Sequence, residues 1–198
     1  MTDFSKVEKN LKDRGFEVAI FKTGAEAAEY LNGKIDGLTV GIGGSSTVAD
    51  IGLFEKLEEH NTMFWHWKQD ADTARKAAMT ADVYLTSANA LAETGEMVNI
   101  DGVGNRISAT LFGHKKVYYI IGKNKLAETY EDAVWRARNV AAPQRAIQLK
   151  RNTPCTVKGD KCYDCKSPER ICRGMTTIFG PMMGMEAEVV LIDEEYGL

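Results

Sequence analysis

Segments in which apolar residues have the spacing of strands alternate with segments in which they have the spacing of helices. This pattern runs along almost the whole 198-residue chain. Apolar runs typical of strands are expected at 16–21, 38–42, 63–67, 82–86, 96–100, 117–121 and 187–192. Apolar residues at helical spacing predict helices within 4–11, 23–31, 48–57, 71–80 and 129–140. This order predicts an α/β fold: a Rossmann-like, mostly parallel sheet with helices on both of its faces.

The composition agrees with one domain over residues 1–198. Hydrophobic residues make up 44% of the chain, which is enough for a core that needs no disulfide support. No internal repeat or long linker divides the sequence. The segment 150–184 differs from the rest because it is rich in Gly, Pro, Cys and Met and lacks periodicity. We expect it to be an ordered loop excursion near the end of the domain.

The charge distribution argues against two classes of partner. The chain carries 25 basic and 28 acidic residues, dispersed along its length, whereas nucleic-acid binding needs a clustered positive field. No apolar run is long enough to span a membrane, and the charged start at Met1–Lys9 does not resemble a signal peptide. We therefore expect a cytoplasmic protein without nucleic-acid or membrane partners.

A glycine- and hydroxyl-rich turn follows the expected strand at 38–42. Glycines allow the backbone to approach a ligand closely, and hydroxyl groups add hydrogen-bond donors for a phosphate or carboxylate. The candidate substrate-binding residues of this turn are Gly43, Gly44, Ser45, Ser46 and Thr47. The turn lacks the lysine of a P-loop and the complete dinucleotide motif, so a tight turn with a helix cap is the alternative.

A second polar block, residues 87–106, follows the expected strand at 82–86. Ligands of open α/β sheets bind at the carboxyl ends of the strands, where this block should lie. Glu93 and Asp101 are candidates for catalytic acid–base work. The amides that could orient a substrate are Asn89, Asn99 and Asn105, and Arg106 could hold an anion. The alternative is a hairpin with turns at Thr94-Gly95 and Asp101-Gly102.

All four cysteines of the chain gather in the segment 150–184, as Cys155-x6-Cys162-x2-Cys165-x6-Cys172. In a reducing cytosol, such crowding favours a metal site over disulfides. Four thiolates suit either tetrahedral zinc or a [4Fe–4S] cluster. If one thiolate were not a ligand, an open iron could act on substrate as a Lewis acid. The basic side chains nearby, Lys158, Lys161, Lys166, Arg170 and Arg173, would offset the negative charge.

The motifs taken together resemble the LUD (lactate-utilisation) family. The resemblance rests on the turn 41–47, the asparagine–glycine block 87–106, and the run Gly122-Lys123-Asn124-Lys125. It also rests on Arg136-x-Arg138-Asn139-x-Ala141-Ala142-Pro143, the cysteine run and Val190-Leu191-Ile192. These motifs span nearly the whole chain.

The resemblance implies a fold similar to that of ribose-5-phosphate isomerase, glucosamine-6-phosphate deaminase and CoA-transferases, with a pocket between the turn and the block. It implies a role near lactate oxidation, with iron–sulfur or flavin subunits as partners, and it favours iron–sulfur over zinc. The leading hypothesis is an iron–sulfur metalloenzyme acting on a small anionic hydroxy acid or sugar acid. The alternatives are an electron-transfer or scaffold subunit, or a sugar-phosphate isomerase or transferase with structural zinc. A homo-oligomer is also compatible.

Several other residues attract no functional prediction. His60, His66 and His114 are scattered, and His66 is expected to be half-buried or solvated on a strand. The methionines near Gly180-Pro181 could form a flexible lid, but filling gaps in the core is the commoner use of this residue.

Overall fold

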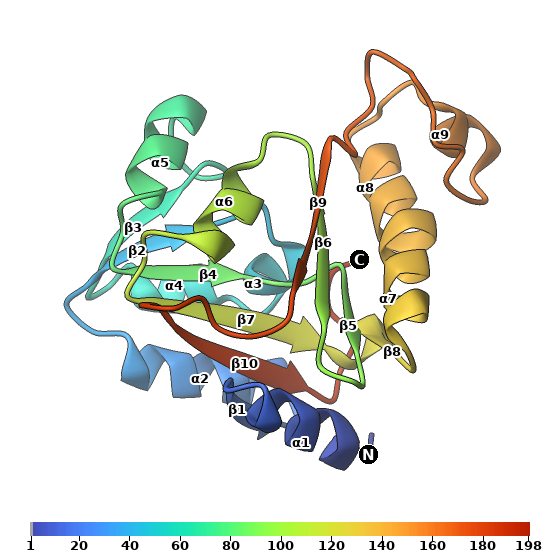
Figure 1. The fold of residues 1–198 in the computed structure, drawn as a ribbon. Helices are drawn as coiled ribbons and strands as arrows, with labels where there is room; N and C mark the ends of the chain where they lie inside the picture. Colours follow the sequence, from blue (N-terminus) through green and yellow to red (C-terminus); the bar gives the residue numbers. More distant parts are fainter. Residues whose placement is uncertain (1) are drawn as a thin grey trace.

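A computed structural model describes residues 2–198, and its centre is a six-stranded parallel sheet (Figure 1). The strands are β1 (Glu17–Phe21), β2 (Thr39–Ile42), β3 (Thr62–Trp65), β4 (Val83–Thr86), β7 (Lys116–Gly122) and β10 (Glu186–Ile192). Their order is β1-β10-β7-β4-β2-β3, and every neighbouring pair is parallel. The mixed α/β fold with a mostly parallel central sheet is therefore confirmed.

Helices cover both faces of this sheet because its strands alternate apolar side chains between two cores. On β7, Tyr118 and Ile120 face one core, and Tyr119 and Ile121 face the other. The first core is shared with α2 (Gly24–Lys34), α3 (Ser46–Asp50) and α4 (Leu53–Leu57). The second is shared with α1 (Ser5–Asp13), α5 (Ala71–Ala78) and α6 (Asn105–Leu111). Within residues 2–198, no helix combines the length and apolar character needed to cross a bilayer.

The single helix expected over 48–57 is wrong, because two short helices occupy this region. Gly52 separates α3 from α4 with a φ of 65°, a left-handed conformation that glycine adopts without steric cost. Ser45 caps α3 by accepting a hydrogen bond from the backbone N–H of Val48 at 3.3 Å. Ser45 therefore fixes the end of the turn between β2 and α3.

A second, smaller sheet stands beside the first one. It contains β8 (Leu126–Ala127), β5 (Ala90–Ala92), β6 (Met97–Asp101) and β9 (Gly174–Ile178), in the order β8-β5-β6-β9. The strand expected at 96–100 is β6, which lies antiparallel between β5 and β9 and outside the main sheet. Gly95, with a φ of 98°, permits the tight turn that joins β5 and β6 into a hairpin. The hairpin alternative for block 87–106 is therefore correct for this part.

A long helical arm packs on the second sheet through small residues. It runs from α7 (Tyr130–Arg136) through the π-helix η2 (Ala137–Ala141) into α8 (Ala142–Gln148), so the helix expected at 129–140 extends further. Ala133 and Ala137 of the arm share a core with Ala90, Ala92 and Val98 of the sheet. The π-helix lies where the arm meets the cysteine-bearing segment, and such π-turns are frequent at functional sites.

The segment 150–184 is more structured than the expected loop excursion. It contains α9 (Pro154–Lys158), and its later part forms β9, which pairs with β6 over five residue pairs. Figure 1 shows residues around α9 projecting as a lobe beyond the end of α8. We call residues 150–173 the cysteine lobe. Strand β9 ties the end of this lobe to the second sheet.

Candidate functional site

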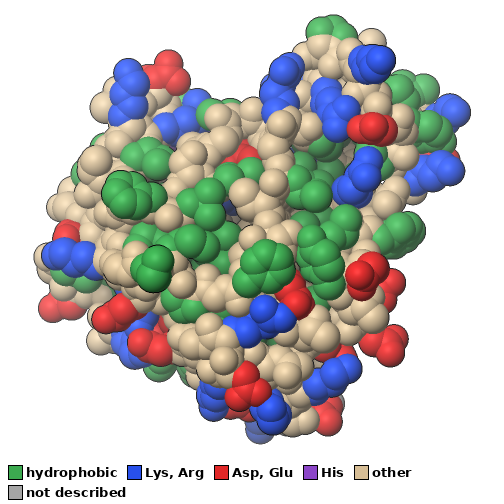
Figure 2. Space-filling model, in the orientation of Figure 1, with side chains coloured by type: hydrophobic (Ala, Val, Ile, Leu, Met, Phe, Trp, Pro, Cys, Tyr) green, Lys and Arg blue, Asp and Glu red, His purple; other side chains and the backbone are tan. Residues whose placement is uncertain are grey.

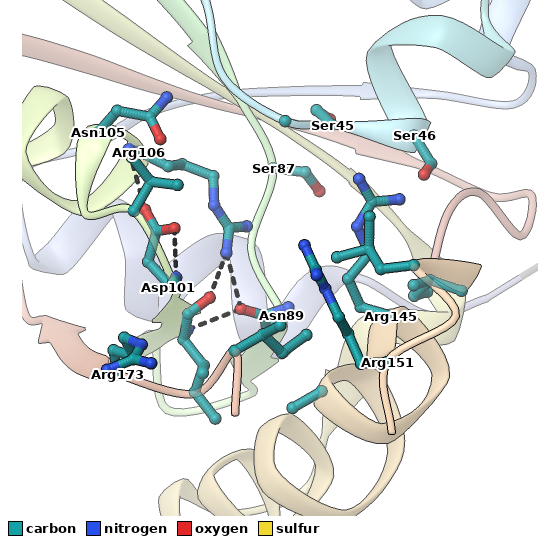
Figure 3. A pocket seen from close by; sticks show the side chains of 18 of the residues that line it. Ser45, Ser46, Ser87, Asn89, Asp101, Asn105, Arg106, Arg145, Arg151 and Arg173 are labelled. Carbon is teal, nitrogen blue, oxygen red and sulfur yellow. Dashed lines mark hydrogen bonds between the residues drawn. The ribbon is translucent and has the colours of Figure 1, made fainter. Parts of the chain in front are cut away.

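A cavity of about 590 Å³ opens at the carboxyl ends of the parallel strands. Its walls include the segments that follow β2, β3, β4 and β7, as expected for an open α/β sheet. The start of α6, the inner side of α8 and the end of the cysteine lobe complete the walls. Figure 3 shows side chains from these segments converging on one space.

Positive charge dominates the walls of the cavity. Seven basic side chains line it: Arg75, Arg106, Lys125, Arg145, Arg151, Arg170 and Arg173. Two acidic side chains, Asp101 and Glu169, accompany them. Since the whole chain is slightly acidic, the excess of basic over acidic side chains is a property of the cavity and not of the protein as a whole. Such a concentration of cations favours an anionic ligand.

Arg106 is held rigidly against the second sheet. Its Nη2 donates to Asn89 Oδ1 at 3.1 Å and to the carbonyl of Ile100. The Oδ1 atom of Asn89 also accepts from the backbone N–H of Ile100 at 2.7 Å, so the amide is fixed from two sides. Burial lowers the pKa of Arg106, although Asp101 opposes the shift. Asn89 and Arg106, both selected from the polar block 87–106, line the same cavity.

Asp101 lines the cavity, and its carboxylate holds the start of α6. Its Oδ2 accepts from the backbone N–H groups of Arg106 at 2.9 Å and Ile107 at 3.2 Å, and Oδ1 accepts from Gly102 at 2.7 Å. These bonds fix the backbone of Arg106 and thereby orient its side chain. Asp101 is thus placed as a helix cap as well as a lining group.

Arg145 and Arg151 reach into the cavity from the side of α8, opposite Asp101 and Arg106 (Figure 3). The guanidinium of Arg145 lies 5.1 Å from the ring centre of Trp67, a cation–π contact that limits its movement. Burial lowers the pKa of Arg145, and the charge of Arg106 lowers it further. The fields of two arginines from opposite walls therefore overlap inside the cavity.

Only some of the substrate-binding residues predicted in the glycine- and hydroxyl-rich turn line the cavity. Gly44, Ser45 and Ser46 line the cavity, whereas Gly43 and Thr47 lie behind that surface. A Cβ at Gly43 would lie 2.9 Å from the Tyr84 hydroxyl and 3.2 Å from Arg106 Cγ, so no larger residue fits there. Gly43 thus serves packing behind Arg106 and does not provide a ligand surface.

Lys125 is buried beneath the turn, at the end of the 3₁₀ helix η1 (Lys123–Lys125) after β7. Its Nζ donates to Thr47 Oγ1 at 2.9 Å and to Ser87 Oγ at 2.8 Å. Burial lowers its pKa to about 7, with further lowering from Arg106 and Arg136 and an opposing effect of Asp50. Lys125 and Ser87 both line the cavity.

Two predicted residues lie away from the cavity walls. Glu93 is on the turn between β5 and β6, where it forms an ion pair with Lys6 at 2.7 Å. The hairpin carries Glu93 away from the cavity, whereas Asp101 lines it. Asn99 is buried on β6, and its side-chain amide finds no hydrogen-bond partner in the described part of the chain. Asn105, in contrast, lines the cavity as predicted.

The cysteine lobe is braced by hydrogen bonds that converge on its backbone. Arg170 donates from Nε to the carbonyl of Cys172 at 2.8 Å and from Nη1 to that of Cys165 at 2.7 Å. Asn139 of the π-helix accepts from the backbone N–H of Cys162 at 3.2 Å. The backbone N–H of Asp164 donates to Cys162 Sγ at 3.4 Å, a bond that would stabilise a thiolate. Figure 2 shows basic side chains gathered over the lobe.

The four thiols are free and partly exposed, and the charges of three of them influence the pKa of the fourth, Cys172. Burial raises the pKa of Cys172 to about 11, the other three thiols raise it further, and Arg170 opposes the shift. Within residues 2–198, no group of three His, Cys, Asp or Glu side chains lies close enough to hold a metal ion. The four thiols have the chemistry to bind a metal, but the described residues do not form the four-thiolate site expected from the sequence.

The lobe reaches the cavity, but its thiols do not line it. Residues 168–171 and Arg173 form part of the wall, while none of the four cysteines is among the lining residues of the described chain. The contact with the asparagine–glycine block is tight, because a Cβ at Gly102 would lie 2.8 Å from the carbonyl oxygen of Ile171. In addition, the backbone N–H of Arg173 donates to the carbonyl of Asp101 at 2.9 Å.

Sequence reasoning missed most of the basic wall. It selected Arg106 as an anion-binding residue, and it named Arg170 and Arg173 only as charges beside the cysteines. It placed His66 and Trp67 on a strand. Strand β3 ends at Trp65, so these two side chains follow a strand end and line the cavity. Burial lowers the pKa of His66, and Arg75 and Arg145 lower it further. The rule that strand ends carry function could have identified His66, Trp67 and Lys125.

Comparisons with known proteins agree on a family and on a fold. The family description "LUD domain" matches residues 4–192 of this chain. Among solved structures, the chain is similar to a DUF162 family protein from Deinococcus radiodurans, with a TM-score of 0.54 and 12% sequence identity over 94% of both chains. At this identity, the structural likeness supports the fold alone. A search of curated proteins found no match.

Proposed function

The chain belongs to the LUD-domain family, and we propose that it binds a small hydroxy acid or 2-oxo acid, as expected for lactate-utilisation chemistry, in the cavity at the strand ends. The observation that carries this proposal is the set of seven basic side chains facing two acidic ones. A carboxylate in this partly buried space would replace water as the partner of the guanidinium groups. Charge-assisted hydrogen bonds of this kind are about twice as strong as neutral ones.

We assign the ligand carboxylate to Arg106 and Arg145. The two guanidinium groups approach from opposite walls, and Arg106 is already fixed by Asn89 and Ile100. Ser46, Asn89 and Asn105 would donate to the remaining oxygens of a hydroxy acid or sugar acid. Asp101 is the acid–base candidate from the sequence that lines the cavity.

We propose that Cys155, Cys162, Cys165 and Cys172 hold a [4Fe–4S] cluster, with zinc as the alternative. The backbone N–H directed at Cys162 Sγ and the arginine that braces Cys165 and Cys172 both support a set of thiolate ligands. Such a cluster would supply one-electron redox chemistry next to the ligand cavity. Because the thiols do not line the cavity, an electron relay is better supported than direct contact between iron and substrate.

A second candidate function is an electron-transfer or scaffold subunit that docks iron–sulfur or flavin partners. The observation in its favour is the apolar face in Figure 2, over α6 and β9. Phe112 is 82% exposed and Phe179 is 58% exposed there, which is unusual for large apolar side chains. A catalytic role and a docking role can coexist, since this face and the cavity use different residues.

Calorimetric titration of the purified protein tests the proposed ligand class. We expect lactate and pyruvate to bind, and lactamide, which lacks the negative charge, to bind at least about tenfold more weakly. Arg145→Gln should weaken the binding of both acids. The matched control is Arg138→Gln, which removes the same charge about two turns earlier on the same helical arm without changing the cavity wall. Equal affinities for lactate and lactamide, or equal effects of the two variants, would contradict the proposal.

A further inference from the structure

One buried amine in the cavity has no role in the ligand binding proposed above. Lys125 Nζ is enclosed by the turn after β2, by Ser87 after β4 and by the segment 196–198. Its side chain is only 4% exposed. No carboxylate among residues 2–198 forms an ion pair with it, unlike the neighbouring Lys123, which pairs with Asp193 at 3.4 Å. Buried lysines without such a partner are rare and are often functional.

The surroundings of Lys125 favour the neutral amine. Arg106 on α6 and Arg136 on α7 present positive charges to it, and Asp50 at the end of α3 is the acid that acts against them. Together with desolvation, these charges lower the pKa of Lys125 to about 7. A substantial fraction of the side chain is therefore unprotonated at neutral pH. This is the protonation state in which a lysine can act as a nucleophile.

The hydrogen bonds of Lys125 leave its lone pair available. A neutral amine has two N–H groups, and here the acceptors are Thr47 Oγ1 at 2.9 Å and Ser87 Oγ at 2.8 Å. Both acceptors hold the nitrogen in place, and the lone pair must point away from them. Lys125 and Ser87 are both lining residues of the cavity, so the amine lies beside the space that a ligand would occupy.

We propose that Lys125 forms an imine with the carbonyl carbon of a 2-oxo acid whose carboxylate is held by the arginines of the cavity. The proposal rests on the ligand class inferred above and adds covalent chemistry to it. The nitrogen lone pair forms a bond to C2 of the acid, and the carbonyl π electrons move to oxygen. That oxygen takes up two protons and leaves as water when the C2–O bond breaks, while the nitrogen gives up its two protons and forms a second bond to C2 with the electron pair thus freed. Ser87 Oγ is placed to pass these protons between nitrogen and oxygen.

Reductive trapping tests this reaction directly. The full-length protein is incubated with pyruvate and sodium cyanoborohydride, which delivers hydride to an imine and fixes it as a secondary amine. The protein is then digested with a protease that cuts after glutamate, and the modified lysine is identified by tandem mass spectrometry. Lys123 is the matched internal control, because it lies two residues away and is partly exposed.

We expect the pyruvate adduct to form on Lys125 at least about tenfold faster than on Lys123 at pH 7.5, because an ordinary lysine is almost fully protonated there. The rate should saturate over the pyruvate range in which calorimetry shows binding. Oxalate, which is anionic but has no ketone, should compete and leave no adduct. Lys125→Met should remove the fast adduct and leave only the slow reaction at the other lysines of this peptide, with circular dichroism confirming that the variant is folded.

The outcomes separate this proposal from the ligand proposal. If pyruvate binds in calorimetry but Lys125 reacts no faster than Lys123, the imine is overturned and the anion site stands. If neither pyruvate nor oxalate binds, the ligand class is overturned, and the imine proposal with it. If Lys125→Met retains the fast adduct on this peptide, the modified residue has been assigned wrongly and the proposal fails.

Discussion

Arg106 Nη2 donates to Asn89 Oδ1 over 3.1 Å, and this contact joins the start of α6 to the loop after β4. The two residues lie 17 positions apart in sequence, and both line the cavity. The amide oxygen cannot turn away, because the backbone N–H of Ile100 also holds it. The guanidinium therefore faces the cavity in a preset orientation, which lowers the entropic cost of binding an anion.

The first prediction concerns Arg106→Lys. A lysine keeps the charge but loses the planar fork that bonds to Asn89 and the Ile100 carbonyl while facing the ligand. We expect pyruvate affinity to fall about tenfold, or ~1.4 kcal/mol, in calorimetry. Lys123→Arg, a change of the same kind outside the cavity, should leave the affinity unaltered. An unchanged affinity in Arg106→Lys would remove this residue from the site.

The two acids selected from the sequence should behave differently. Asp101→Ala removes the acceptor of two backbone N–H groups at the start of α6 and of the Gly102 N–H, and should cost about 1–2 kcal/mol in urea unfolding. It should also weaken ligand binding, because Arg106 loses its support. Glu93→Gln breaks an ion pair on the surface and should alter neither quantity measurably. A larger loss of binding in Glu93→Gln would reverse our assignment.

Lys125 should leave a signature in the pH dependence of stability. Its pKa is about 7 in the folded state and about 10.4 when unfolded, so between these values the unfolded chain holds a proton that the folded chain lacks. This group therefore makes stability rise with pH across that window and removes stability below it. We expect wild type to gain roughly 4 kcal/mol relative to Lys125→Met from pH 7 to pH 10. Parallel curves for the two proteins would show that the buried amine does not titrate in this range.

Glu188 is a buried carboxylate near the amino end of β10, and its pKa also falls on folding, so it too makes stability rise with pH, but in an acidic window. Burial raises its pKa, but bonds from Tyr30 at 2.6 Å, Lys34 at 3.0 Å and Lys116 outweigh this and lower it overall. Its contribution is present above about pH 4.3 and is lost as the pH falls through the lowered value.

We expect Glu188→Ala to cost about 3–5 kcal/mol at pH 7, because two lysines lose their buried partner. Urea unfolding at pH 7 and pH 3 measures this, and the gap between the variant and wild type should narrow at the lower pH. As a control, Glu29→Ala removes an exposed partner of Lys56 and should produce a much smaller change. A gap that widens in acid would contradict the assigned direction.

The cysteine lobe predicts the outcome of anaerobic purification. We expect a brown protein containing iron and sulfide, and we expect that Cys162→Ser lowers the bound iron. A chelator should then increase proteolysis within residues 150–173 more than elsewhere, because the lobe would lose its internal cross-link. A colourless protein with one zinc would support the alternative metal. A protein that binds no metal after reconstitution would reject both.

The arrangement of the main sheet could be predicted from the sequence, because its strands are short, apolar and separated by amphipathic helices. The second sheet could not be predicted equally well. Its strands β5 and β8 contain three and two residues, too few to show alternation. Their pairing depends on contacts between segments far apart in the chain, which local patterns do not encode. The break at Gly52 was visible as a glycine but was outweighed by the apolar spacing around it.

In the candidate site, too, local sequence patterns predict some residues, whereas others are brought to the site only by contacts between distant segments. Asn89, Asp101 and Arg106 were found because a turn-rich block follows a strand. Arg145 and Arg151 were missed because basic residues on a helix and after it resemble solvated surface. Glu93 was overvalued because distance along the chain did not show that the hairpin turns it outward. The position of such side chains is decided by tertiary packing.

Strand β10 carries the last residues of the main sheet, yet it lies inside that sheet, between β1 and β7. Residues 186–192 must therefore leave the ribosome before the first strand can join the others. Until then, β7 presents an open edge and β1 has no neighbour in the sheet. The wall of the anion cavity includes Leu198, so the cavity also cannot be complete before this part of the chain has been synthesised.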